Sequence, residues 1–293
     1  SGFIGKNLVN DPFFQFATSL GRTKPNNTTR HIYTELDSAA DFENHLKGVD
    51  TVIHLAGRAH VISNDVISEN ALMAEINTQE TLNLAEQCIR YGVKNFIFLS
   101  SAKVLGEENI LGRPFTNLSK INPVGPYAIS KANAENGLIS ICNNTPMSYT
   151  IIRAPLIYGP GVKGNLRSLQ ALVKKRLPLP LGNINNKKSM ISIYNLISLI
   201  KCCVTSEAAH NKIFLASDGD DLSTPRLIRL IALSLQKKVW IVNLPEPVLK
   251  HFLRASGRQE WFSKLTQSFE VDIDYTMSTL GWKPKPIEPK DFN

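Results

Sequence analysis

Short runs rich in β-branched and aromatic residues alternate with amphipathic stretches in the first half of the chain, and this alternation limits the fold most. The strand-like runs are 31–37 (HIYTELD), 51–57 (TVIHLAG), 95–101 (NFIFLSS) and 148–159 (SYTIIRAPLIYG). Helical patterns are clearest at 77–92 and 126–142. Alternating strand and helix units form a parallel sheet with helices on both faces. The sequence therefore predicts an α/β fold with a Rossmann-type doubly wound sheet, and ligands bound beyond the carboxyl ends of its strands.

The pattern changes after about residue 160. A connection rich in proline, glycine and asparagine, 177–189, is followed by mixed elements: strand-like runs at 212–217 and 240–245, and helical patterns at 224–238 and near 246–257. We predict that residues 1–160 form a dinucleotide-binding domain. Residues 161–293 are predicted to form mainly a smaller substrate-binding lobe, interleaved with the first domain.

The chain opens with SGFIG, and its glycines at 2 and 5 precede a helical pattern. This is typical of the end of a glycine-rich turn, where backbone amides hold a pyrophosphate. A hydrophobic strand and a first glycine normally come just before such a turn. We therefore expect an N-terminally truncated domain that lacks the first, central strand of its sheet, and we interpret the chain as a gene fragment. Soluble expression and cooperative unfolding of residues 1–293 alone would contradict this.

Tyr127 and Lys131 lie four residues apart in the stretch PYAISKANAE, so that a helix would place both on one face. A free tyrosine has a pKa near 10 and is a poor base at neutral pH. A lysine ammonium one turn away favours the phenolate and is expected to bring that pKa toward the working pH. Such pairs also occur by chance. Here a strand-like run ending in Ser101 precedes the pair, which favours catalysis.

Charge and cysteine content exclude several classes of function. The formal net charge is +8, but the basic residues are scattered and no nucleic-acid motif is present, which favours an anionic small substrate over nucleic acid. The four cysteines show no metal-ligand spacing, so no metal site is predicted, and they suit a reducing cytoplasm. No apolar run approaches the roughly 18 residues of a membrane span.

Six stretches carry a family resemblance by their order and spacing: SGFIG, VIHLAG, INTQETLNLAE, FLSSAKVLGE, PYAISKANAE and IIRAPLIYGPGVKGN. Together they resemble the extended short-chain dehydrogenase/reductases, and more narrowly the NAD-dependent epimerase/dehydratase family. The likeness covers nearly the whole chain. It extends to a subgroup of UDP-hexose 4-epimerases and UDP-N-acetylquinovosamine 4-dehydrogenases (4-ketoreductases) of surface polysaccharide synthesis. It implies a nucleotide-sugar substrate, NAD or NADP as cofactor, and a homodimer.

The resemblance also implies roles for single residues. Tyr127 would be the acid/base, with Lys131 as its partner and Ser101 bonded to the same sugar oxygen. Asn77 would be a structural asparagine, or simply a helix N-cap. The implied cofactor contacts are Gly2, Phe3, Ile4, Gly5, Arg22, Glu35, Leu36, Leu55, Ala56, Gly57, Asn77, Tyr127, Lys131 and Ala154; those to substrate are Ser101, Asn165 and Lys188.

Three departures from the family pattern concern binding. Ala154 stands where relatives usually carry a proline beside the nicotinamide, and Lys188 where they usually carry an arginine against the diphosphate. Lys264 likewise stands where close relatives tend to have an arginine. Lysine offers a point charge in place of a bidentate fork. The run FQFATSLGR, expected as the second strand of the family's sheet, ends in Arg22, where NAD-preferring members have an acidic residue. An arginine there leans toward NADP.

The motifs leave three functions open. A 4-epimerase and a 4-ketoreductase of a UDP-6-deoxy-hexosamine share one site chemistry, so the motifs do not separate them. A non-catalytic dinucleotide-binding protein, or an inactive fragment, is the third reading. A 4,6-dehydratase is disfavoured, because the stretch SSAKVLG lacks the acid/base carboxylate pair that such an enzyme carries after its catalytic serine.

Overall fold

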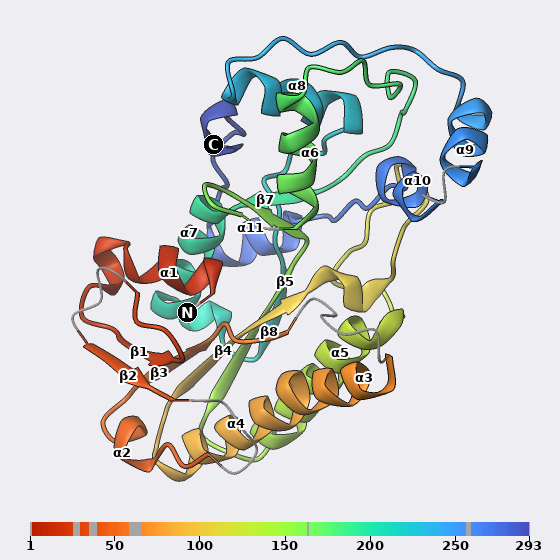
Figure 1. The fold of residues 1–293 in the computed structure, drawn as a ribbon. Coiled ribbons are helices and arrows are strands. Elements are labelled where there is room, and N and C mark those ends of the chain that lie inside the picture. The colour runs from red at the N-terminus through yellow and green to blue at the C-terminus, as the bar shows by residue number, and fades with distance from the viewer. Residues whose placement is uncertain are drawn as a thin grey trace.

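The computed structural model describes residues 2–25, 30–34, 40–58, 66–162, 164–255 and 259–292. Its centre is a four-stranded parallel sheet in the order β3-β4-β5-β8 (Figure 1). The strands are β3 Thr51–His54, β4 Asn95–Ser101, β5 Ser148–Ala154 and β8 Lys212–Leu215. The β4–β5 register runs from Asn95 opposite Ser148 to Ser101 opposite Ala154. The prediction of a parallel α/β sheet is confirmed.

Helices cover both faces of this sheet (Figure 1). On one face lie α3 Val66–Ala74, α4 Glu80–Arg90 and α5 Gly125–Cys142; on the other lie α1 Phe3–Val9 and α7 Ile193–Thr205. Because side chains alternate along a strand, β4 contributes to both layers. Phe96 and Phe98 pack among residues of α4 and α5, while Ile97 and Leu99 pack among residues of α7.

Two further strands form a separate parallel pair beside the main sheet: β1 Thr18–Gly21 and β2 Arg30–Tyr33. β1 pairs with β2, and β3 pairs with β4. Within the described part of the chain, no strand pairs with the remaining edge of β1 or of β3.

A second group of elements packs around its own hydrophobic cluster, which includes Leu166, Val173, Ile228 and Phe292. The elements are β6 Leu156–Tyr158 paired with β7 Met190–Ser192, and the helices α6 Asn165–Lys174, α8 Thr224–Ser234, α9 Glu246–Ala255 and α10 Gln259–Thr266. The later segments α7 and β8 pack with the main sheet. The division at residue 160 stays a prediction.

The remaining elements are short: α2 Glu43–Leu46, α11 Asp274–Leu280, and single 3₁₀ turns at Pro12–Phe14, Ala102–Leu105, Glu207–Ala209 and Pro289–Phe292. Among the helices of the described ranges, none has the length and apolar character needed to cross a membrane.

Three predicted elements differ from the structure. The strand expected over 148–159 is divided at Pro155, because a proline has no amide hydrogen to donate to a ladder. The run 240–245 forms only an isolated bridge, between Ile241 and Leu179. The helix expected to begin at Asn77 instead continues from α3 through a π-helical turn, Glu75–Gln79, into α4.

Candidate active site

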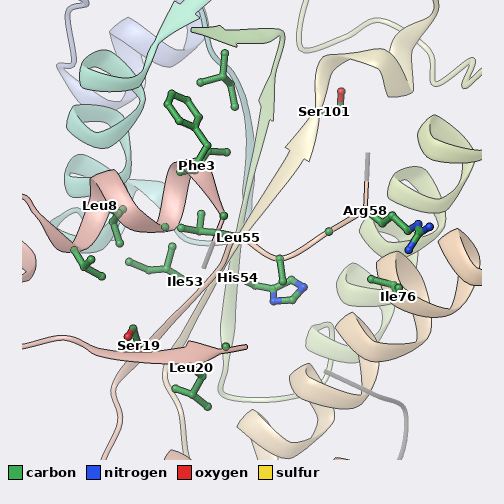
Figure 2. A pocket seen from close by; sticks show the side chains of 18 of the residues that line it. Phe3, Leu8, Ser19, Leu20, Ile53, His54, Leu55, Arg58, Ile76 and Ser101 are labelled. Atoms are coloured by element: carbon green, nitrogen blue, oxygen red, sulfur yellow. The ribbon is translucent and has the colours of Figure 1, made fainter. Parts of the chain in front are cut away.

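A large cavity, about 2320 Å³, opens beyond the carboxyl ends of β3 and β4 and extends along β1 (Figure 2). This volume exceeds the roughly 300–1,000 Å³ of a site for one small molecule, so the cavity has room for more than one ligand. Of the residues predicted for cofactor and substrate, it is lined by Gly2, Phe3, Ile4, Gly5, Arg22, Leu55, Ala56, Gly57, Ser101, Tyr127 and Lys188. The structure thus brings together residues from both halves of the chain.

The hydroxyl groups of Ser101 and Tyr127 meet at this cavity. Ser101 ends β4, and Tyr127 lies in the first turn of α5. Ser101 lies near enough to Tyr127 for its hydroxyl to favour the phenolate, but burial outweighs that effect and raises the pKa of Tyr127. The sequence predicted a lowered pKa for this phenol. In this structure burial of the ring is the stronger effect.

Lys131 lies one turn further along α5 and is 4% exposed. Its ammonium donates to the Leu99 carbonyl at 3.1 Å and lies 4.5 Å from the centroid of the Phe98 ring. Burial lowers the pKa of Lys131 to about 8, with the nearby Glu135 carboxylate opposing that shift. The ammonium is therefore held against β4 and gives up its proton more readily than an exposed lysine.

Asn77 fixes the loop that follows β3. Its Oδ1 accepts from the Arg58 amide at 2.7 Å, and its Nδ2 donates to the Arg58 carbonyl at 3.0 Å and to the Ser130 hydroxyl at 2.9 Å. The alternative that Asn77 is a helix N-cap is wrong, because it lies inside a π-helical turn between two helices. Its side chain instead joins the β3 loop to α5.

Gly57 has little room for a side chain. A Cβ there would lie 3.0 Å from the Lys131 Nζ and 3.1 Å from the Asn77 Oδ1, whereas one at Gly2 would meet open space. We expect Gly57→Ala to lower the free energy of unfolding by about 1–3 kcal/mol through overpacking. Denaturant unfolding measures this, with Gly2→Ala as the control that keeps wild-type stability. Equal stability of the two variants would contradict the close packing at Gly57.

His54 ends β3 and is buried between aromatic rings. Its ring centroid lies 5.9 Å from that of Phe96 and 5.8 Å from that of Phe98, and its Nε2 is 3.0 Å from the Thr81 hydroxyl. Burial, together with the positive charge of Lys131, lowers the pKa of His54 to about 3. The imidazole is therefore neutral in the working range and packs in the wall of the cavity (Figure 2).

Lys188 stands at the end of the cavity formed by the second group of elements. Its backbone forms bridges with Leu222 and Phe269, and its ammonium donates to the Lys264 carbonyl. Burial lowers the pKa of Lys188 to about 8. Lys264 lines the cavity as well, so two lysines border this end.

Other predicted residues lie at the margin of the cavity or beyond the described part of the chain. Ala154 is buried at the end of β5, and its neighbour Pro155 lines the cavity. Asn165 is the first residue of α6, and the residues on either side of it line the cavity. The predicted adenine contacts Glu35 and Leu36 fall outside the described residues.

Sequence reasoning missed several lining residues. Thr224 begins α8, and Ser263 lies in α10. Lys103 and Glu107 form an ion pair at 3.0 Å beside Ser101, and both line the cavity. The lysine at 103 could have been noticed from its place directly after the serine motif. Thr224 and Ser263 carry no local signal, since only tertiary packing brings them to the cavity.

Comparisons with known proteins agree with this geometry. Residues 1–214 match the model of the NAD dependent epimerase/dehydratase family. A UDP-glucose 4-epimerase of Vibrio cholerae is 40% identical over all of this chain and 91% of the relative. An N-acetyl-alpha-D-glucosaminyl-diphospho-ditrans,octacis-undecaprenol 4-epimerase of Escherichia coli O157:H7 is 30% identical over 85% of this chain and 74% of the relative.

A solved structure shows the same fold. MoeE5 in complex with UDP-glucose and NAD superposes with a TM-score of 0.77 at 18% identity, over 99% of this chain and 93% of that one.

Proposed function

This chain belongs to the NAD dependent epimerase/dehydratase family, and we propose that it is an NAD(P)-dependent enzyme that epimerises a UDP-hexose or UDP-hexosamine at C4 through a 4-keto sugar. The observation that carries the proposal is that Ser101, at the end of β4, and Tyr127 line the cavity together, with the Ser101 hydroxyl near the phenol. Lys131 is buried one turn behind them. These are the groups that a proton transfer at a sugar hydroxyl requires.

The residues of the cavity fit a dinucleotide. Glycines at 2, 5 and 57 line it, and the lack of space at Gly57 shows that backbone, rather than side chain, forms that part of the wall. Arg22 is exposed directly after β1 and lines the same cavity, where a guanidinium can pair with a ribose 2′-phosphate. When bound, the nicotinamide supplies the acceptor and donor of hydride.

The chain's own groups handle the proton. Tyr127 takes the proton of the sugar 4-hydroxyl as the hydride leaves C4, and Ser101 donates a hydrogen bond to the same oxygen. The positive charge of Lys131 stabilises the phenolate. After the keto sugar turns its other face, hydride returns to C4 and Tyr127 returns the proton to the 4-oxygen, so that the second C4 epimer is formed.

The UDP end of the substrate is assigned to the second group of elements. Lys188 and Lys264 border that end of the cavity and offer positive charge to a diphosphate, and α6, which begins at Asn165, forms its wall. The relatives named 4-epimerases support a diphosphate-linked sugar as the substrate class.

A second candidate is a 4-ketoreductase of a UDP-6-deoxy-hexosamine that uses NADPH. The same Ser101, Tyr127 and Lys131 serve a reductase, and Arg22 favours NADPH. A non-catalytic dinucleotide-binding protein is disfavoured, since it needs no tyrosine and serine hydroxyls in contact.

The test incubates the purified protein with UDP-glucose or UDP-N-acetylglucosamine and follows the 4-epimers by chromatography. Nucleotide released on denaturation is identified in parallel. Epimer formation without net oxidation of NADPH supports the epimerase. Stoichiometric NADPH oxidation with a UDP-4-keto-6-deoxy sugar supports the reductase. Nucleotide binding without either reaction supports the non-catalytic reading and overturns the proposal.

We also propose that the enzyme is a cytoplasmic homodimer. The cysteines at 88, 142, 202 and 203 are all free, which suits a reducing compartment. Exposed apolar side chains at Ile121, Val124 and Ile129 lie before and within the first turns of α5 and offer a surface for a second copy. Light scattering would give twice the 32.6 kDa of the chain for a dimer, and a mass of one chain would contradict it.

A further inference from the structure

The catalytic face of α5 continues beyond Lys131 to a buried acid. Tyr127, Lys131 and Glu135 follow one another at intervals of four residues, so their side chains lie on one face of the helix. Glu135 is 0% exposed. It lies one turn further from the cavity than Lys131 and is not among the described residues that line it.

Glu135 joins α5 to two strands at once. Its Oε1 accepts from the Ser100 hydroxyl at 2.5 Å and from the Arg153 Nε at 3.1 Å. Its Oε2 accepts from the Arg153 Nε at 3.1 Å and from the Arg153 Nη2 at 2.6 Å. Ser100 is 4% exposed and Arg153 3%. The whole set is thus out of water, where charge-assisted hydrogen bonds are strong and fix geometry.

The two partners of Glu135 are the immediate neighbours of cavity residues. Ser100 precedes Ser101 at the end of β4, and Arg153 precedes Ala154 at the end of β5. Because successive side chains of a strand point to opposite faces, Ser100 turns toward α5 while Ser101 turns toward the cavity. A bond from Glu135 to Ser100 therefore sets how far α5 lies along β4.

We propose that Glu135 is a positioning residue that fixes α5 against the ends of β4 and β5, so that the Tyr127 hydroxyl meets the Ser101 hydroxyl. The inference rests on the proposed function, since it concerns the same acid/base group. It explains why a carboxylate, an arginine and a serine are buried together behind the cavity, where apolar packing alone would not determine the position of the helix along the strand.

Glu135 also supplies charge near Lys131. The titratable groups around the Lys131 ammonium are Tyr127 and Glu135 on its own helix, His54 on β3, and Arg153 on β5 behind Glu135. His54 is neutral, because its pKa is lowered to about 3. The Glu135 carboxylate is the group that raises the pKa of Lys131 against the effect of burial.

The main experiment compares wild type with Glu135→Gln, which keeps the size of the side chain and removes its charge. We expect kcat to fall by about 10- to 100-fold, since a small displacement of a catalytic group costs up to about 100-fold. KM for the sugar nucleotide and the affinity for NAD(P) should change less than about threefold, because no residue of the cavity is altered. The alkaline limb of kcat should move to lower pH, as Lys131 loses the carboxylate that raises its pKa.

An ultraviolet titration of tyrosinate gives a readout that does not depend on turnover. The signal of Tyr127 is obtained by subtracting the titration of Tyr127→Phe. Where the Tyr127–Ser101 bond is lost, the pKa of Tyr127 rises further, since that bond is what opposes burial. A Tyr127 titration and a kcat profile in Glu135→Gln identical to wild type would overturn the inference.

Two further variants separate positioning from simple loss of stability. Asp218→Asn alters another buried carboxylate, which accepts from Tyr158 and Asn195 far from Tyr127 in the chain, and it should keep the wild-type pH profile. Ser100→Ala removes one partner of Glu135 and keeps the ion pair, so it should show a smaller loss of kcat in the same direction even where Glu135→Gln does not fold. A Ser100→Ala variant with the kcat of wild type would count against the inference. A wild-type enzyme without epimerase activity would count against the proposed function instead.

Discussion

Tyr127→Phe is expected to lower kcat by about 10²–10⁴-fold, the range that a positioned acid/base group contributes. Phenylalanine keeps the ring, which is the part that fills the wall of the cavity, and removes the hydroxyl that contacts Ser101. The affinity for NAD(P) should therefore stay within about threefold of wild type. Turnover is measured by epimer formation at saturating substrate, and cofactor affinity by fluorescence quenching.

The matched control is Tyr158→Phe. Tyr158 is also buried, and its hydroxyl donates to Asp218 at 2.7 Å, but it does not belong to the described lining of the cavity. This variant should lose stability, by about 1.5–3 kcal/mol for the lost hydrogen bond to a charged group, and keep its kcat. Equal kcat values for Tyr127→Phe and wild type would refute the assigned role of Tyr127.

The second large effect is expected for Lys131→Met, which keeps an unbranched chain and removes the ammonium. We expect kcat to fall by about 10²–10⁴-fold, because the phenolate of Tyr127 loses its stabilising charge. Lys201→Met is the control: Lys201 pairs with Asp11 at 2.6 Å on α7, and its loss should leave kcat unchanged. A Lys131→Met enzyme as active as this control would contradict the role of the ammonium.

Lys131 also predicts how stability depends on pH. Its pKa is lowered by burial from 10.5 to about 8, so between these values the unfolded chain binds more protons than the folded one. The free energy of unfolding therefore gains a contribution that rises with pH through this window, while the cost of burying the charge is present in full below pH 8. Denaturant titrations at several pH values should show that rise in wild type and lose it in Lys131→Met.

The local elements could be predicted because their patterns are strong. The strand over 95–101 was predicted to the residue, since its β-branched and aromatic run is bounded by polar residues, and the helix over 126–142 begins only one residue earlier than predicted. The π-helical turn at Glu75–Gln79 could not be predicted, because its reason is the non-local contact of Asn77 with the loop after β3.

The candidate site also has features that the sequence could predict and features that it could not. Ser101 and Tyr127 could be predicted to meet, because the end of a parallel strand and the start of the following helix lie at the same edge of a sheet. The partnership of Glu135 with Ser100 and Arg153 could not, because each of the three reads as an ordinary residue in its own segment. The raised pKa of Tyr127 was likewise missed, since burial depends on the packing of the whole cavity.

Because β1 and β3 are not paired with each other, the two parts of the sheet are expected to open locally with different ease. β1 and β2 pair only with each other within the described residues, whereas β4 is paired along both edges. A two-stranded ribbon is marginal by itself, so its amides should exchange with solvent through local opening long before those of β4 and β5. Arg22, beyond β1, and Leu55, beyond β3, both line the cavity, so a dinucleotide bound there would touch both parts. Its binding free energy would then stabilise the β1–β2 pair against the four-stranded sheet, so that the coenzyme would stabilise the folded protein as well as take part in the reaction.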